Sequence, residues 1–217
     1  MRAFIYWILL AFALASAARS APISESELKN LLASIRQNRT TQADFQEERV
    51  IRLMKKPIVS SGQIWFQPPN KFRREVKGSS PSVTVSSGRE LWIYYPNFKS
   101  AERYPLGKGS PLDATVAAIN SALNLENIET SFNVTATKTE SGNELQLLPR
   151  TAAMKRVFQK LDLRINNEFR VERTDMLLPN GDRIVTTYSK QTRAPIPPSA
   201  FEFKPPTGTE VTTPLGQ

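Results

Sequence analysis

Near the start of the chain, apolar residues recur at the spacing of one helix stripe. Four of them share one side of a helix over residues 24–38: Leu28, Leu31, Leu32 and Ile35. Ser24 and Glu27 match a capping box, which satisfies the free N–H groups at a helix start. We therefore predict an amphipathic helix, whose apolar stripe either packs on the core or covers a cavity.

A second helical pattern interrupts the chain within residues 105–125. Ser110 and Pro111 suit a helix start, because serine caps free N–H groups and proline has none to cap. The apolar stripe that follows consists of Leu112, Val116, Ile119 and Leu123. This pattern predicts a second amphipathic helix between two strand-rich halves.

Strand-like alternation of apolar and polar residues dominates the rest of the chain. The predicted strands are residues 43–54, 62–67, 71–76, 82–85, 90–95, 131–137, 143–149, 157–165, 168–177, 183–189 and 201–211. Turns at Gly88 and at Asn180-Gly181 join two pairs of them as hairpins, and Pro68-Pro69 ends another strand. Because there is no internal repeat or linker, we predict one α+β domain, a strongly curved antiparallel sheet with two helices packed on one face.

The strand predicted at residues 90–95 carries large side chains on both faces. Leu91, Ile93 and Tyr95 alternate with Trp92 and Tyr94. A strand with one solvated face would carry polar residues on that face. We therefore expect both faces of this strand to be covered at least in part.

The first twenty residues indicate a secretory signal peptide. Arg2 precedes an apolar stretch over residues 4–15, and small residues follow at Ala15-Ser16-Ala17 and Ala18-Arg19-Ser20. The stretch is short for a membrane span. We predict cleavage after about residue 17 or 20 and export of a single mature domain, residues 21–217. The alternative is an uncleaved anchor.

The chain contains neither cysteine nor histidine. An exported domain of this kind relies on its core without disulfides, and no cysteine is present for lipidation. Ser-His-Asp and Cys-His catalysis and histidine metal sites are excluded, and no glycine-rich nucleotide motif occurs. The carboxylates of Glu47, Glu48 and Asp162 fit acid–base roles, but a solvated sheet face accounts for them. We predict no enzyme activity, no metal and no cofactor.

The formal net charge is +9. Four of the cations cluster around Phe72: Lys71, Arg73, Arg74 and Lys77. This pattern is similar to a nucleic-acid stripe, but an exported protein does not meet nucleic acid, so we predict none as a partner. A solvated strand face, or a surface for an anionic membrane or acidic protein, are the other interpretations.

A curved sheet with amphipathic helices and no catalytic groups suits a cavity for a hydrophobic ligand, because such sites are concave and mostly apolar. A filled core is the alternative. Alternation predicts the cavity lining as Ile64, Phe66, Phe72, Leu91, Ile93, Leu163, Ile165 and Phe169. Helical spacing predicts the lid as Leu28, Leu31, Ile35, Leu112, Val116 and Ile119.

Three motifs follow one another over most of the predicted mature chain. They are Trp65 with Pro69-Asn70-Lys71-Phe72, then Leu91-Trp92-Ile93-Tyr94-Tyr95-Pro96, then Phe201 to Gly208. In this order and behind a signal peptide they resemble the LolA family of periplasmic outer-membrane lipoprotein carriers. That family has a strand with tryptophan leading into P-N-x-F, a hairpin ending L-W-x-Y-x-P, and F-x-F-x-P-P-x-G near the C-terminus.

The resemblance implies a half-open β-barrel lidded by helices, which carries lipoprotein acyl chains across the periplasm. It also implies three partners: an acylated lipoprotein as cargo, an inner-membrane ABC-type transporter as donor and an outer-membrane lipoprotein receptor as acceptor. Because no cysteine is available for lipidation, the chain is similar to the soluble carrier, expected as a monomer, rather than to the receptor.

One position departs from the family pattern. The best-known carriers have an arginine just before the P-N, where it bonds to the lid helices and keeps the empty cavity closed. Pro68 occupies this position and has no side-chain donor. We therefore expect a looser lid, or a lid held by another group.

Other functions fit the same fold. A sensor or adaptor domain would bind an exposed lipoprotein or glycolipid signal without ferrying it, and a related carrier would serve a glycolipid exporter. A carrier exists free and gives up its cargo, whereas a sensor keeps a fixed complex. A structural adaptor would have a filled core, and the missing histidine disfavours a hydrolase.

Overall fold

The computed structural model describes residues 21–106 and 128–214, and its strands form one sheet. The thirteen strands lie in the order β1-β8-β9-β10-β11-β12-β2-β3-β4-β5-β6-β7-β13. They are β1 (Ala21–Pro22), β2 (Gln42–Val50), β3 (Ile58–Gln67), β4 (Lys71–Lys77), β5 (Ser82–Ser86), β6 (Glu90–Tyr95), β7 (Ser100–Pro105), β8 (Phe132–Thr139), β9 (Gly142–Pro149), β10 (Lys160–Asn166), β11 (Val171–Leu177), β12 (Arg183–Thr192) and β13 (Glu210–Thr212).

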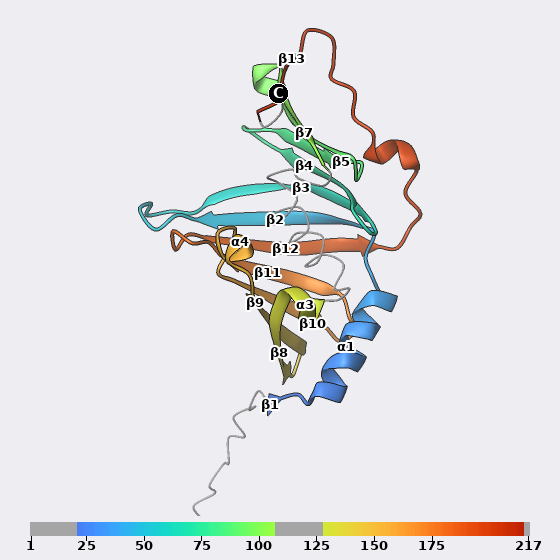
Figure 1. The fold of residues 1–217 in the computed structure, drawn as a ribbon, viewed down its shortest axis with the longest axis vertical. Helices are drawn as coiled ribbons and strands as arrows, with labels where there is room; N and C mark the ends of the chain where they lie inside the picture. Colours follow the sequence, from blue (N-terminus) through green and yellow to red (C-terminus); the bar gives the residue numbers. More distant parts are fainter. Residues whose placement is uncertain (1–20, 107–127, 215–217) are drawn as a thin grey trace, which may run out of the picture.

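The sheet is curved and open. In Figure 1 the central strands β3, β2 and β12 run across the view, while strands toward both ends of the order turn steeply away from them. Neighbouring strands are antiparallel except β13, which runs parallel to β7. The end strands β1 and β13 do not pair with each other. The predicted fold, a strongly curved antiparallel sheet that forms an unclosed barrel, is confirmed.

Cross-strand register defines the two faces of the sheet, because residues directly opposite each other share a face. The inner face is marked by the row Ala43, Ile64, Arg74, Thr84 and Ile93 on β2 to β6. The outer face is marked by the next row, Gln42, Trp65, Arg73, Val85 and Trp92.

Helix α1 (Glu25–Gln37) agrees with the prediction to within about a residue. The Ser24 hydroxyl accepts the Glu27 backbone N–H at 3.3 Å, and the Ser24 backbone N–H donates to the Glu27 carboxylate at 2.8 Å. The apolar stripe packs on the inner face of β8 to β10, where Leu31 and Leu32 are buried. Core packing therefore accounts for these two leucines.

The other described helices are short: α3 (Ile128–Ser131), α4 (Ala152–Lys155), and the 3-10 turns η1 (Pro96–Phe98) and η2 (Pro198–Phe201). Helix α4 shortens the strand predicted over residues 157–165, which begins only at Lys160. The N–H groups of Val157 and Phe158 donate to the Met154 carbonyl instead. Phe158 stacks on Phe132 with ring centroids 5.9 Å apart and is fully buried.

Two predicted segments lie outside the described residues: the signal peptide, residues 1–20, and the second helix, residues 110–123. Within residues 21–106 and 128–214, no helix is both long enough and apolar enough to cross a membrane.

The strand predicted over residues 43–54 is too long. β2 ends at Val50, and β3 begins at Ile58, four residues before its predicted start. Between them the chain reverses, and the Met54 N–H donates to the Ile51 carbonyl at 2.9 Å. The resulting hairpin projects from the side of the sheet in Figure 1.

Both predicted glycine turns are present. Gly88 joins β5 to β6 with φ +86°, and Gly181 joins β11 to β12 with φ +83°. These left-handed conformations are open to glycine because it has no Cβ. Local sequence therefore determines both hairpin positions.

The strand predicted over residues 201–211 is wrong for most of its length. Phe201 ends the turn η2, and only Glu210–Thr212 pair with β7. The apolar alternation in this segment has another cause, because the segment crosses the outer face of the sheet. There Arg73 Nη1 donates to the Ala200 carbonyl at 3.2 Å.

Phe203, from the same segment, covers the outer face of β6. Its ring centroid lies 5.5 Å from that of Trp92 and 5.6 Å from that of Tyr94. On the inner face of the same strand, Leu91 is buried. The prediction that both faces of this strand are covered is confirmed.

Candidate functional site

A cavity of about 120 Å³ lies between the C-terminal end of α1 and the inner face of the sheet. Four predicted cavity residues line it, namely Ile64, Phe66, Leu163 and Phe169. Ile35, a predicted lid residue, faces the same space from α1. Alternation on separate strands and helical spacing on α1 thus converge on one place in the fold.

Phe169 reaches the cavity from the turn between β10 and β11. Its φ is +60°, which is uncommon for a residue other than glycine. Asn166 holds this turn: its side-chain oxygen accepts the N–H groups of Glu168 and Arg170, both at 3.0 Å. The Phe169 N–H donates to the Asn166 carbonyl at 3.0 Å. The turn therefore fixes the backbone from which the ring projects.

The connection after α1 holds the helix end over the cavity. The Thr41 N–H donates to the Thr192 carbonyl on β12 at 2.8 Å, and the Phe66 N–H on β3 donates to the Thr41 carbonyl at 2.7 Å. The Arg39 guanidinium lies 5.9 Å from the Phe66 ring centroid and lines the cavity. These contacts position the helix end without a side-chain donor at Pro68.

Three other predicted lining residues pack elsewhere on the inner face. Phe72 and Leu91 form a buried cluster with Phe66, next to Tyr104. Ile93 is half-buried in the row that marks the inner face. Phe66 belongs to both groups, so it joins the cavity to this cluster.

Three more predicted residues pack in or against the main core. Ile165 is fully buried there with Leu31, and Leu28 packs against the same core from its margin. The predicted lid residues Leu112, Val116 and Ile119 lie outside the described residues. The described lid over the cavity is therefore the last turn of α1, represented by Ile35.

An ion pair lies among the apolar residues of the inner face. Arg74 Nη2 lies 2.8 Å from Glu47 Oε2, and the side chains are only 27% and 17% exposed. The Arg74 guanidinium also lies 4.4 Å from the Phe45 ring centroid. Thr186, opposite Glu47 on β12, is buried. Such a pair costs desolvation that its hydrogen bonds and cation–π contact offset.

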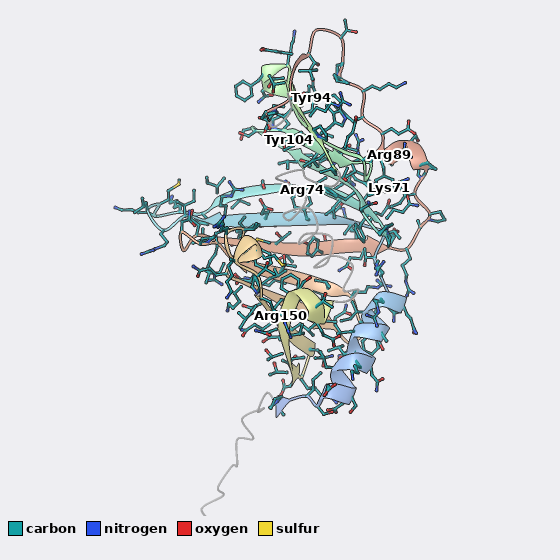
Figure 2. All side chains as sticks on the ribbon, viewed as in Figure 1. Lys71, Arg74, Arg89, Tyr94, Tyr104 and Arg150 are labelled. Atoms are coloured by element: carbon teal, nitrogen blue, oxygen red, sulfur yellow. The ribbon has the colours of Figure 1, made fainter. Side chains whose placement is uncertain are left out.

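This pair corrects two predictions. Glu47 does not lie on a solvated face, because its position two residues from Phe45 places it on the inner face. The basic cluster does not form one stripe either: Arg74 points to the inner face, while Arg73 lies on the outer face beside Glu75, at 2.7 Å. Figure 2 labels Arg74 near the middle of the sheet. Strict alternation along β4 is the sequence signal that places the two arginines on opposite faces of the sheet.

Two tyrosines of the inner face stay neutral at physiological pH. Burial raises the pKa of Tyr188, although a hydrogen bond with Thr174 and the charge of Arg74 oppose the shift. Burial, together with the hydrogen bond that its hydroxyl donates to Glu102 at 2.7 Å, raises the pKa of Tyr104 to about 12. The phenol groups therefore add no charge to the inner face.

The surface of the cavity suits the binding of apolar groups. In the part of the chain that the structure describes, no three histidine, cysteine or acidic side chains lie close enough to hold a metal ion. The surface that the cavity exposes is mostly apolar, although polar side chains, including those of Arg36, Arg39 and Arg170, also line it. Such a surface binds apolar groups by removing them from water, with little demand on their exact shape.

Comparison with known proteins agrees with these features. The model of the family described as outer membrane lipoprotein carrier protein LolA matches residues 36–204. An outer-membrane lipoprotein carrier protein of Chromobacterium violaceum is 29% identical over 208 residues, covering 94% of this chain and 95% of its own. One from Methylococcus capsulatus is 29% identical over 217 residues, covering 97% and 98%.

A solved structure shares the fold. It is an uncharacterized conserved protein from Thermus thermophilus, with a TM-score of 0.53, 15% sequence identity, and coverage of 86% of this chain and 99% of that one. The family match spans well over half of the 217 residues and includes the end of α1, the cavity lining apart from Ile35, and the ion pair. The chain therefore belongs to the LolA family of outer membrane lipoprotein carrier proteins.

Proposed function

We propose that this protein is a periplasmic carrier that shields lipoprotein acyl chains and transfers them from the inner to the outer membrane. The observation that carries the proposal is the apolar cavity between Ile35 of α1 and Ile64, Phe66, Leu163 and Phe169. The names of the relatives support lipoproteins as the cargo. The mechanism needs no enzyme activity.

The energetics of transport explain why a cavity is needed. Exposing methylene groups to water costs about 0.8 kcal/mol each, so one palmitoyl-length chain costs on the order of 10 kcal/mol. A free lipoprotein therefore does not cross an aqueous gap at a useful rate. An apolar wall offsets most of this cost without specific bonds, so the cargo stays transferable to a better acceptor.

Loading requires the cavity to grow. Pockets for drug-sized ligands measure roughly 300–1,000 Å³, whereas this cavity measures about 120 Å³. Ile35 and the end of α1 form one wall, so movement of this helix end away from the inner face would enlarge it. The backbone hydrogen bonds of Thr41 with Thr192 and Phe66 resist that movement.

The donor and acceptor follow from the same proposal. An inner-membrane ABC-type transporter loads the carrier, and an outer-membrane lipoprotein receptor takes the cargo. Since the sequence has no glycine-rich nucleotide motif, energy for loading comes from the transporter. Export depends on the predicted signal peptide at residues 1–20, and the protein acts as a monomer.

Binding of a triacylated lipopeptide tests the cavity. We expect the exported protein, purified without detergent, to bind the lipopeptide. The affinity of the variant Ile64→Arg should be at least about tenfold lower, because a charge in the apolar wall opposes acyl burial. Ile64 is only half-buried, and circular dichroism checks that the variant keeps its fold. Titration calorimetry measures the affinity.

Val211→Arg is the matched control, because Val211 is a β-branched residue 45% exposed on β13, away from the cavity. Its affinity should equal that of the unmodified protein. A diacyl glycolipid offered in the same assay separates the two cargo classes. If the unmodified protein binds no acylated ligand, or if Ile64→Arg binds as well as Val211→Arg, the carrier proposal is wrong.

A further inference from the structure

The hairpin between β2 and β3 ends in exposed apolar side chains. We call residues Arg49–Val59 the β2–β3 tip. Leu53 is 97% exposed, and Met54 and Val59 are about half exposed at 49% and 56%. In Figure 1 this hairpin projects beyond the rest of the sheet. Apolar groups that project together from a fold are typical of an interaction site.

Cations surround these apolar side chains. The tip contains Arg49, Arg52, Lys55 and Lys56 and no acidic residue, so its formal charge is +4. All four side chains are exposed. Among the described residues, no ion pair engages Arg49, Lys55 or Lys56. The tip therefore combines an apolar end with a net positive charge of its own residues.

Contacts with the neighbouring β11–β12 turn hold the tip in place. The Arg52 backbone N–H donates to the Asp182 carboxylate at 3.0 Å, which ties the tip to the neighbouring β11–β12 turn. A Cβ at Gly181 in that turn would lie 2.6 Å from the Arg52 side chain, so the two hairpins touch closely. Leu53 and Met54 directly follow Arg52 in the chain, and their side chains remain exposed.

The size and chemistry of the tip favour a lipid surface over a protein partner. A stable protein interface buries about 800 Å² from each partner, with roughly 20–30 residues a side. The tip, residues Arg49–Val59, is much smaller than that. Binding to a bilayer requires a smaller contact area. A few aliphatic side chains enter the headgroup boundary, and basic residues contact anionic lipids.

We propose that the β2–β3 tip docks the protein on an anionic lipid surface, with Leu53 and Met54 inserted and the four cations among the headgroups. The tip and the cavity lie at opposite ends of β2, which spans nine residues. Ala43, which lines the cavity, lies six residues before Arg49, where the tip begins, so at about 3.3 Å for each residue roughly 20 Å separate them. Docking therefore leaves the cavity outside the bilayer and does not depend on acyl-chain binding.

Each part of the tip contributes to vesicle binding. A cation near an anionic surface strengthens binding about fivefold, and burial of a leucine side chain strengthens it about tenfold or more. Because few groups take part, binding is weak and reversible. High salt screens the cations, so the affinity falls as salt rises.

Vesicle co-sedimentation of the exported protein, purified without detergent, tests the proposal. We expect binding to vesicles of phosphatidylcholine with phosphatidylglycerol, and none to phosphatidylcholine alone. Leu53→Asp should weaken binding about tenfold or more. The double variant Lys55→Glu, Lys56→Glu should weaken it by at least about 25-fold, the product of two fivefold steps.

Matched controls carry the same kinds of change elsewhere. Phe98→Asp makes the same change from an apolar to an acidic side chain at a residue that is 80% exposed in η1, far from the tip along the sheet order. Lys138→Glu with Lys204→Glu alters the net charge equally at two other exposed lysines. Both controls should bind vesicles like the unmodified protein.

Two outcomes would overturn the proposal: no binding to the anionic vesicles, which would favour a protein partner for the tip, or equal binding by Leu53→Asp and Phe98→Asp. A measurement of lipopeptide affinity distinguishes a failure of lipid docking from a failure of the proposed carrier function. Leu53→Asp should keep the affinity of the unmodified protein for a triacylated lipopeptide, because Leu53 lies outside the cavity lining.

Discussion

Arg74 and Glu47 are charged residues on a face that otherwise packs apolar side chains. The pair is closed at 2.8 Å, and Phe45 lies under the guanidinium at 4.4 Å. Each charge satisfies the other, and neither is more than 27% exposed. The pair therefore places two charges beside the cavity, because Ile64, which lines it, lies directly opposite Arg74.

Removing one partner should cost more than removing both. We expect Glu47→Leu to lower the free energy of unfolding by about 1–3 kcal/mol, because it leaves Arg74 half-buried without its partner. The double variant Glu47→Leu, Arg74→Leu should recover most of the loss. Urea unfolding of the two single variants and the double variant gives the coupling. Additive losses would mean that the pair does not act as a unit.

Alternation along a strand predicts which face of the sheet a single residue lies on. It placed Ile64, Phe66 and Leu163 on one face, and the register agrees. The same rule would have placed Glu47 beside Phe45, but acidic residues are so often solvated that composition outweighed position. Its partner, Arg74, lies on another strand, and a pattern along one strand does not reveal cross-strand partners.

Among the elements, those with local signals were predictable and those set by distant contacts were not. The capping box at Ser24 and the turn at Gly181 depend on neighbouring residues, so α1 and the β11–β12 hairpin agree with prediction. The alternation of Phe201 and Phe203 also resembles a strand. Here it comes from packing across the outer face of β6, which only the folded sheet provides.

The C-terminal segment should stabilise the sheet through Phe203. We expect Phe203→Ala to lower the free energy of unfolding by about 1–3 kcal/mol, because it uncovers Trp92 and Tyr94. Phe98→Ala makes the same change at a side chain that is 80% exposed and should cost little. Urea unfolding followed by tryptophan fluorescence measures both. Equal stability of the two variants would contradict the packing role.

For the whole molecule, the sequence predicted an open curved sheet but not the extent of its cavity. Phe72, Leu91 and Ile165 share the inner face with Ile64, yet they pack in buried clusters. Among the described elements, the position of α1 decides which part of the inner face is covered by a helix. That position depends on contacts between the α1 stripe and β8 to β10, about a hundred residues or more away in the sequence.

The cavity also explains how one fold serves transport. In the proposed function, a mostly apolar wall would hold acyl chains by burial, and a cavity of about 120 Å³ would have to widen to accept them. Both properties allow release, because the cargo leaves when an acceptor buries it better. The β2–β3 tip adds a separate contact with a lipid surface at the other end of β2.

The mass of the protein as it leaves the cell tests the central claim most directly. The exported protein, isolated without detergent, would be measured by native mass spectrometry before and after incubation with a triacylated lipopeptide. The account predicts a bound acylated species, lost in Ile64→Arg and kept in Val211→Arg. A protein that stays at its unliganded mass throughout would contradict it.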